Sequence, residues 1–235
     1  MRQIIALGGG GFSMEPDNPL LDRYILKQAS VKRPKICFVP TASGDADGYI
    51  QRFYTFFNEQ ECEPTHLSLF KPSTKNLQDY ILKQDIIYVG GGNTKNLLIL
   101  WKEWGLDQIL KTAYDQGILL CGISAGAICW YEEGLTDSFG DTLEPIKALG
   151  ILKGSHTPHY DGEMNRRPAY LQMVKDRLII PGIAADDGVG LHYVNGELMK
   201  VVSSRPNTAA YRVEISNDGV EEKILEPFYL GKEDL

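Results

Sequence analysis

The chain has 235 residues, of which 43% are hydrophobic and 23% charged, a balance typical of a globular protein with one sizeable core. We therefore expect a single domain over residues 1–235. The net charge of −7 argues against a nucleic-acid or anionic-membrane surface, because either would need clustered lysines and arginines. No apolar stretch approaches the roughly 20 residues of a membrane span, and the apolar start of the chain is too short for a signal peptide.

The four cysteines show no C-x-x-C spacing, and two of them, Cys37 and Cys121, lie inside apolar runs typical of strands. Such residues behave as small buried hydrophobes. We expect thiols in a reducing cytoplasm, with no metal bound by the cysteines.

Strands alternate with helices over the first 130 residues. The apolar patterns predict strands at 2–7, 35–40, 65–70 and 85–89, and helices at 20–28, 49–59, 77–83, 94–100 and 106–116. This alternation indicates a parallel sheet covered on both faces by helices. Ligands of such sheets collect at the carboxyl ends of the strands.

Beyond residue 134 the pattern changes to loops rich in glycine, aspartate, proline and histidine, followed by a helix near 167–175. Strand signals then follow at 179–184, 189–194, 200–203 and 211–215. Asn195-Gly196 is typical of a two-residue hairpin turn.

Two glycine runs, Gly8 to Gly11 and Gly90 to Gly92, each follow a predicted strand. The first lacks the Lys-Ser/Thr ending of a P-loop and the spacing of a dinucleotide fingerprint, so it favours close backbone approach to a neighbouring loop or a substrate over phosphate binding. After the second run, Asn93 or Thr94 would cap the next helix.

Ser124 occupies the centre of Gly122-Ile123-Ser124-Ala125-Gly126, between the apolar run 118–121 and a small apolar segment at 125–130 that can start a helix. The two glycines let the backbone turn sharply between strand and helix. This turn would lift the hydroxyl above the sheet edge, at the positive end of a helix. That is the geometry a nucleophile needs.

A serine nucleophile needs a positioned base, usually a histidine, and a carboxylate that orients it. His66 is expected to be structural, and His192 lies in a late strand as a secondary candidate. His156 and His159 lie in a loop with proline and glycine at a suitable distance to return over the sheet, so one of this pair is the predicted base.

Acyl transfer also needs donors for the oxyanion that develops in the transition state. The amide of Ala125 comes with the turn itself. A second amide could come from the run Gly90 to Gly92, because consecutive glycines permit close approach and unusual dihedral angles. The other reading of this run is a tight strand-to-helix turn with no role in chemistry.

Three segments, 90–94, 122–127 and Pro158-His159, resemble in order and spacing the dipeptidase E (aspartyl dipeptidase) family of serine peptidases, whose relatives include cyanophycinase. The resemblance covers the chain from the first strand to about residue 215. It implies an α/β three-layer sandwich with a mostly parallel sheet, similar to class I glutamine amidotransferases, whose nucleophile turn usually carries cysteine. It also implies Ser124 as nucleophile, His159 as base, and Gly92 and Ala125 as oxyanion donors.

The resemblance assigns the third catalytic residue, the carboxylate, less directly. The family has an aspartate in a threonine-rich segment between serine and histidine, and residues 135–141 occupy that interval here. Asp137 is the better match and Asp141 the second. Either could instead be an ordinary turn aspartate.

Substrate selection in the aspartyl dipeptidases uses an arginine after the catalytic histidine. Here Arg166 or Arg167 could supply a two-pronged carboxylate clamp, although the spacing is shorter, and each could equally be a surface residue at a helix start. We expect Asn93, Arg166 and Arg167 to be the substrate-binding residues. Asp186-Asp187 is a candidate for binding a substrate amino group or for forming a turn.

The resemblance thus implies a cytoplasmic serine exopeptidase or dipeptidase that hydrolyses small peptides through an acyl-enzyme on Ser124. It implies no metal and no organic cofactor, and it implies a preference for N-terminal aspartate if an arginine reaches the pocket. One alternative is an α/β-hydrolase esterase that uses His192 with Asp186 or Asp187, because G-x-S-x-G is also its signature. The other is a non-catalytic binding protein on the same scaffold. The sequence is compatible with a monomer or a homodimer.

Overall fold

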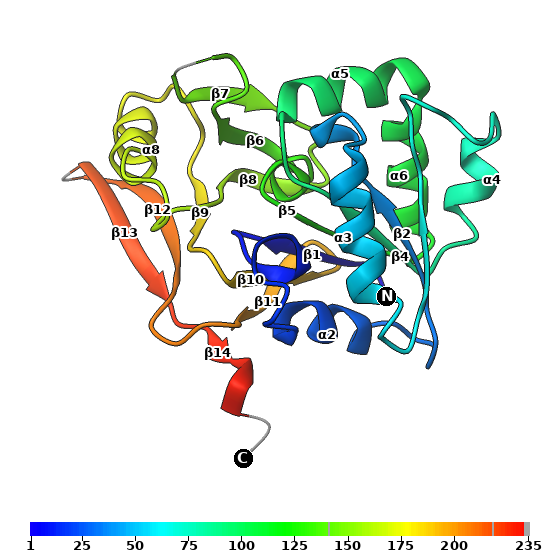
Figure 1. The fold of residues 1–235 in the computed structure, drawn as a ribbon. Helices are drawn as coiled ribbons and strands as arrows, with labels where there is room; N and C mark the ends of the chain where they lie inside the picture. The colour runs from blue at the N-terminus through cyan, green and yellow to red at the C-terminus, as the bar shows by residue number, and fades with distance from the viewer. Residues whose placement is uncertain (141, 218, 233–235) are drawn as a thin grey trace.

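The computed structural model describes residues 1–140, 142–217 and 219–232 and contains two sheets (Figure 1). The eight-stranded sheet has the order β14-β11-β10-β1-β5-β4-β2-β3, and the six-stranded sheet has the order β13-β12-β9-β8-β6-β7. The strands are β1 (Gln3–Leu7), β2 (Lys35–Val39), β3 (Glu63–His66), β4 (Ile86–Val89), β5 (Leu119–Ile123), β6 (Tyr131–Thr136), β7 (Glu144–Lys147), β8 (Leu152–Thr157), β9 (Gly182–Ala185), β10 (Val189–Val194), β11 (Glu197–Ser203), β12 (Ala210–Ser216), β13 (Gly219–Leu225) and β14 (Phe228–Tyr229).

Most of the helices connect strands of the first sheet. The α-helices are α1 (Gly11–Met14), α2 (Leu20–Lys27), α3 (Asp47–Phe57), α4 (Leu77–Ile81), α5 (Thr94–Trp104), α6 (Leu106–Asp115), α7 (Ala125–Ile128) and α8 (Arg166–Lys175), and two short 3-10 helices span Thr41–Ser43 and Leu230–Lys232. Among the described residues, none of these helices is long and apolar enough to cross a membrane.

The first sheet is buried on both faces because its central strands are apolar throughout. In β1, Ile4 and Ala6 belong to one apolar cluster, whereas Ile5 and Leu7 belong to another. The alternation follows from the two-residue repeat of a strand, which turns successive side chains to opposite faces. The expected sheet with helices on both faces is confirmed.

The two sheets share an apolar cluster. It contains Val89 of β4 and Trp101 of α5 together with Leu152 of β8 and Ile183 of β9, all buried. The second sheet therefore packs on the side of the first sheet that α5 also covers. The single domain that length and composition suggest stays a prediction.

Five strands of the first sheet, β3, β2, β4, β5 and β1, run parallel in that spatial order. Beyond β1 the sheet becomes antiparallel, since β10 pairs with β1 and β11 pairs with β10. The predicted Asn195-Gly196 turn joins β10 to β11, and its residues have the positive φ values, 52° and 90°, that a two-residue hairpin turn requires.

The strand registers place several loops at one edge of the first sheet. Leu7 pairs with Ile123, and Val89 pairs with Gly122, so β1, β5 and β4 end side by side. Leu7 also pairs with Gly190, near the beginning of antiparallel β10. The segments after residues 7, 89 and 123 and the segment before 189 therefore meet at this edge.

The strands of the second sheet within residues 131–157 were not predicted, because the sequence pattern indicated loops beyond residue 134. The strands there are short and carry polar or charged residues, as in Tyr131–Thr136 and Glu144–Lys147. Such segments lack the apolar runs that identify a strand from sequence. The helix after Ser124 also ends at Ile128 rather than extending to residue 130.

All four cysteines are free and buried, as expected from the sequence. Each fills space in the core as a small apolar side chain. Burial raises the pKa of Cys37 to about 12, so this thiol is not a reactive thiolate at neutral pH.

Asp22 is an unusual core residue, because a carboxylate on α2 is completely buried. Its Oδ2 accepts the backbone N–H of Phe12 at 2.7 Å, which holds the loop after β1 against α2. Burial disfavours the charged form and raises the pKa of Asp22 from 3.8 to about 7. The folded chain therefore binds a proton here that the unfolded chain releases at lower pH.

This pKa shift predicts a pH-dependent stability. Because the folded pKa lies above the unfolded value, the contribution of Asp22 is greatest in acid and is lost as the pH rises through about 7. Asp22→Asn stays neutral and can still accept the Phe12 amide. We expect the free energy of unfolding, measured with urea, to fall from pH 5 to pH 8 by on the order of 2 kcal/mol more in the wild type than in the variant. Identical pH profiles would contradict this assignment.

Candidate functional site

Ser124 is the single residue that connects β5 to α7, and its backbone angles are φ 57° and ψ −114°. This backbone conformation is uncommon for a residue other than glycine and is typically held in place at functional sites. Ser124 is partly exposed, whereas every residue of β5 and α7 is buried. A Cβ atom on Gly122 would overlap the carbonyl oxygen of Gly126, so the turn depends on glycine there. The geometry predicted for the serine turn is present.

Two glycine loops flank this serine, because β5 lies between β1 and β4. The Ser124 N–H donates to the Leu7 carbonyl at 3.2 Å, at the end of β1. On the other side, a Cβ atom added to Gly91 would lie 3.3 Å from the Ser124 Cβ and 3.8 Å from its Oγ. A side chain at position 91 would therefore crowd the side chain of the serine.

The backbone amides of the second glycine loop are nearly all paired. The N–H of Gly90 donates to Val39 O at 3.1 Å, that of Gly91 to Tyr49 OH at 3.2 Å, and that of Asn93 to Ala42 O at 2.8 Å. No acceptor for the Gly92 amide is found within the described parts of the chain, and Gly92 is exposed. The loop therefore presents one free amide in a row of bonded ones.

Gly92 has φ 136°, a value that favours glycine, and a Cβ atom there would overlap the carbonyl oxygen of Ala42. The amide of Ala125, at the first position of α7, likewise has no acceptor among residues 1–140, 142–217 and 219–232. The two amides that the resemblance implies as oxyanion donors are thus both unpaired.

His159 follows β8 of the second sheet and reaches the edge of the first. Its N–H donates to Gly8 O at 3.0 Å. Since the Ser124 amide binds the carbonyl of Leu7, Ser124 and His159 are attached to consecutive residues at the end of β1. His159 also has a positive φ, 54°, so both candidate catalytic residues are held in uncommon backbone conformations.

Asp187 is the hydrogen-bonded partner of the His159 ring, with 2.7 Å between Oδ1 and Nδ1. The histidine and aspartate side chains are only 15% and 12% exposed, so the pair is largely shielded from water. The Asp187 N–H in turn donates to Asp161 Oδ1 at 2.8 Å. Asp187 precedes β10, and the pairing of β10 with β1 brings this residue to the edge where β1 ends.

Gly9 makes this pair possible. A Cβ atom on Gly9 would overlap Asp187 Oδ1 and lie 3.2 Å from His159 Nδ1. The close approach of the first glycine run to a neighbouring loop, predicted from the sequence, is confirmed.

Asp137 does not reach His159, in contrast to the arrangement that the resemblance implied. It is exposed in the turn after β6, where its carbonyl accepts the N–H of Gly140 at 3.3 Å. Asp141, the second candidate, lies outside the described residues. The partner of the histidine is Asp187, which the sequence analysis had considered as a turn residue, as an amine ligand or as the acid partner of His192, but not as the partner of His159. Asp187 directly precedes a strand that the sequence predicted. The pairing of that strand with β1, which brings Asp187 to the site, could not be predicted from the sequence.

The other three histidines have partners that do not involve Ser124. His156 is buried, its Nδ1 lies 2.8 Å from Ile183 O, and burial lowers its pKa to about 4. His66 contacts the Tyr54 hydroxyl at 2.8 Å. His192 lies within β10, and its ring nitrogens contact Tyr24 OH and Gln3 Oε1 at 2.7 and 2.9 Å.

Both arginines predicted to bind substrate are paired with protein carboxylates. Arg166 is 3% exposed, and its guanidinium contacts Glu163 Oε2 at 2.7 Å and donates to Leu135 O at 3.1 Å. Arg167 contacts Glu222 Oε2 at 2.8 Å. Neither guanidinium is an unpaired cation.

Asn93 is used within the fold. Its Oδ1 accepts the Asn96 N–H at 2.8 Å and so caps α5, as expected, while its Nδ2 donates to Ser138 O at 3.1 Å. Asp186 is buried, and its Oδ2 accepts the Ala209 N–H at 2.9 Å. Burial raises the pKa of Asp186 to about 6. This carboxylate supports the backbone of the adjacent loop.

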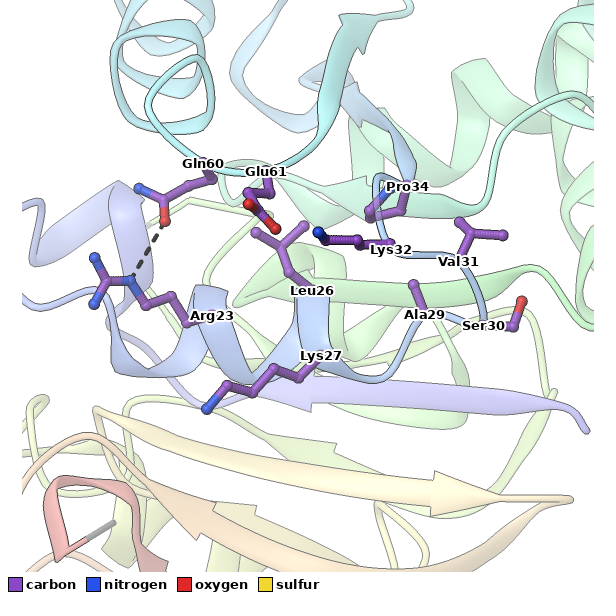
Figure 2. Close-up of a pocket in the computed structure, with 10 residues that line it drawn as sticks. All are labelled: Arg23, Leu26, Lys27, Ala29, Ser30, Val31, Lys32, Pro34, Gln60 and Glu61. Atoms are coloured by element: carbon purple, nitrogen blue, oxygen red, sulfur yellow. Dashed lines mark hydrogen bonds between the residues drawn. The ribbon is translucent and has the colours of Figure 1, made fainter. Parts of the chain in front are cut away.

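A cavity of about 480 Å³ lies away from this constellation (Figure 2). It is bordered by the end of α2 and the segment leading into β2, and thus lies near the amino end of that strand. The residues that line it are Arg23, Leu26, Lys27, Ala29, Ser30, Val31, Lys32, Pro34, Gln60 and Glu61. Because β2 runs parallel to β5, the cavity and Ser124 lie at opposite edges of the sheet.

Known proteins resemble this chain over most of its length. The model of peptidase family S51 matches residues 4–201. The uncharacterized peptidase YgaJ of Bacillus subtilis is 57% identical over 231 residues, covering 98% of this chain and all of that protein. The PdxT subunit of pyridoxal 5'-phosphate synthase from Staphylothermus marinus is 24% identical over 149 residues, covering 57% of this chain and 72% of that one.

Among solved structures, a peptidase from an acI-B1 actinobacterium superposes with a TM-score of 0.74 at 16% identity, covering 97% of this chain and 95% of that one. At this identity the likeness concerns the fold alone. Together with the family match, it confirms the predicted α/β fold of the class I glutamine amidotransferase type.

Proposed function

The chain belongs to peptidase family S51 and is a serine-type peptidase, and from this premise we propose that it hydrolyses small peptides through an acyl-enzyme on Ser124. The observation that supports this most is the attachment of Ser124 and His159 to the consecutive carbonyls of Leu7 and Gly8. That attachment fixes the backbones of a partly exposed serine with positive φ, and of a histidine that already has a carboxylate partner, at the end of the same strand.

In the first step, the Ser124 Oγ attacks the carbonyl carbon of the substrate while His159 accepts the hydroxyl proton at Nε2. The Nδ1–H of His159 donates to Asp187, which fixes the ring orientation and stabilises the imidazolium that forms. We therefore assign to Asp187 the role that the resemblance had given to Asp137.

The negative charge that develops on the substrate oxygen needs donors that are already in place. The free amides of Gly92 and Ala125 are our candidates. His159 then protonates the leaving amine, and water attacks the acyl-enzyme with the same histidine as base.

We further propose a cytoplasmic exopeptidase or dipeptidase. Four free buried cysteines fit a reducing compartment.

The esterase alternative required His192 as base, and the Gln3 and Tyr24 contacts of that ring leave it without a carboxylate partner among the described hydrogen bonds. The geometry favours the peptidase over the esterase.

The acid assignment predicts a contrast between two aspartates. Asp187→Asn should lower kcat for a dipeptide by about 10² to 10⁴, because the amide no longer stabilises the protonated ring of His159. Asp137→Asn is the matched control and should change kcat less than threefold, since that residue is exposed and the described hydrogen bond of the His159 ring goes to Asp187. Steady-state kinetics of both variants would reverse our assignment if the larger loss occurred at Asp137.

The nucleophile assignment predicts covalent labelling of a single serine. A fluorophosphonate should modify Ser124 in the wild type, as located by peptide mass spectrometry, and both labelling and dipeptide turnover should disappear in Ser124→Ala. The variant should remain folded, because it loses only a partly exposed hydroxyl. Ser30→Ala is a control with an exposed serine that lies beside the cavity away from this site. Turnover within tenfold of the wild type in Ser124→Ala would exclude this nucleophile.

The arginine contacts predict substrate preference. We expect no more than a tenfold preference for dipeptides that begin with aspartate over those that begin with alanine, because each guanidinium already binds a protein carboxylate. A panel that varies the N-terminal residue, assayed on the wild type, Arg166→Lys and Arg167→Lys, measures this. A strong preference for aspartate that is lost in either variant would show that this arginine binds the substrate carboxylate.

A further inference from the structure

Tyr49, on α3, connects the two glycine loops that flank Ser124. Its hydroxyl oxygen accepts the N–H of Gly91 at 3.2 Å and the hydroxyl proton of Ser13 at 2.8 Å. Gly91 belongs to the loop after β4, and Ser13 lies in α1, which follows the glycine run after β1. One oxygen atom therefore bridges the segments on both sides of β5.

The ring of Tyr49 is fixed by its packing. The residue is 6% exposed, and its ring packs edge-on against Phe38, at 4.9 Å between centroids, and at a tilt of 33° against Phe12, at 5.7 Å. A Cβ atom on Gly90 would lie 3.0 Å from the ring at Cε1, so the backbone of the loop rests directly on this side chain. The hydroxyl is thus held at a defined position beneath Gly91.

In the glycine loop after β4, the backbone amides on both sides of Gly92 are hydrogen-bonded. Before it, the amide of Gly91 is held by Tyr49; after it, the amide of Asn93 is held by Ala42 O at 2.8 Å. The peptide planes on both sides of the Gly92 amide are therefore anchored, although that amide itself has no acceptor among the described residues. Glycine alone would leave the loop free to rotate, because it restricts φ and ψ least.

We propose that Tyr49 is a positioning residue for the reaction: its hydroxyl holds the Gly91 amide so that the Gly92 amide faces the oxygen that becomes negative. The proposal rests on the proposed function of Ser124 and Gly92. Tyr49 touches neither substrate nor nucleophile and acts only through the loop.

The chemistry of a tyrosine hydroxyl suits this position. It accepts a backbone N–H without carrying charge, and burial raises the pKa of Tyr49, so the phenol stays neutral. A carboxylate would bind the same amide more strongly, but it would place a negative charge near the developing oxyanion and oppose its formation.

The variant Tyr49→Phe removes one oxygen atom and keeps the packed ring. Because the oxyanion exists in the transition state and not in the bound substrate, loosening its donor should lower kcat about tenfold and leave KM within about twofold. The affinity of a peptide boronic acid, whose tetrahedral adduct with Ser124 places an oxygen at the oxyanion position, should fall by a similar factor.

Amide hydrogen exchange supplies a readout that does not depend on turnover. In Tyr49→Phe the Gly91 amide should exchange faster, whereas the Gly90 amide, bonded to Val39 O, should not change. Tyr54→Phe is the matched control, since this residue lies on the same helix and its hydroxyl contacts His66. Ser13→Ala removes the second contact of the hydroxyl and should give a smaller loss of kcat in the same direction.

Each outcome decides the proposal. It is supported if Tyr49→Phe loses kcat selectively, weakens boronate binding and exposes Gly91, while Tyr54→Phe does none of these. It is overturned if kcat is unchanged, if KM and thermal stability change together with kcat, or if Gly91 exchange is unaffected. Failure of a fluorophosphonate to label Ser124 in the wild type would instead overturn the proposed function, and the role of Tyr49 with it.

Discussion

The hydrogen bond between His159 and Asp187 connects the segments that follow two paired strands of the second sheet. The histidine follows β8 and the aspartate follows β9, which run parallel with Thr157 beside Ala184, so this 2.7 Å contact depends on the pairing of these strands. Its low exposure strengthens the electrostatic attraction, since little water screens the two groups. Gly9 must lie against both residues for the contact to form, because any side chain there would occupy the position of the carboxylate.

The site is built largely from backbone groups at one sheet edge. Three parallel strands, β1, β5 and β4, end together and each is followed by glycine or by a residue with positive φ. The uncommon conformations of Ser124 and His159 cost free energy locally. That cost is offset by burial of the strands that precede each residue, which have little freedom to relax. A rigid scaffold therefore holds reactive groups where a flexible loop could not.

Both arginines that were expected to bind substrate have carboxylate partners within the protein. Arg167 is bound to Glu222 and lies over the rings of Tyr160 and Tyr211, at 5.5 and 4.9 Å from their centroids. A substrate carboxylate would have to replace an existing partner of the same chemistry, which yields little net free energy. The two guanidinium groups of this helix thus stabilise the fold, whereas the amides of Gly92 and Ala125 have no acceptor among the described residues.

The sequence by itself determined the parallel half of the first sheet, the serine turn, the two glycine loops and the burial of the cysteines. These features arise from local patterns: apolar runs bury strands, and glycines permit the dihedral angles and approaches of the turns around them. Only the tertiary structure decided that Asp187, rather than Asp137, meets His159, that both arginines are neutralised, and that polar segments such as Tyr131–Thr136 form a second sheet. Each of these three features depends on contacts between segments that are far apart in the chain. Such contacts produce no periodic pattern of apolar residues, so they cannot be predicted from the local sequence.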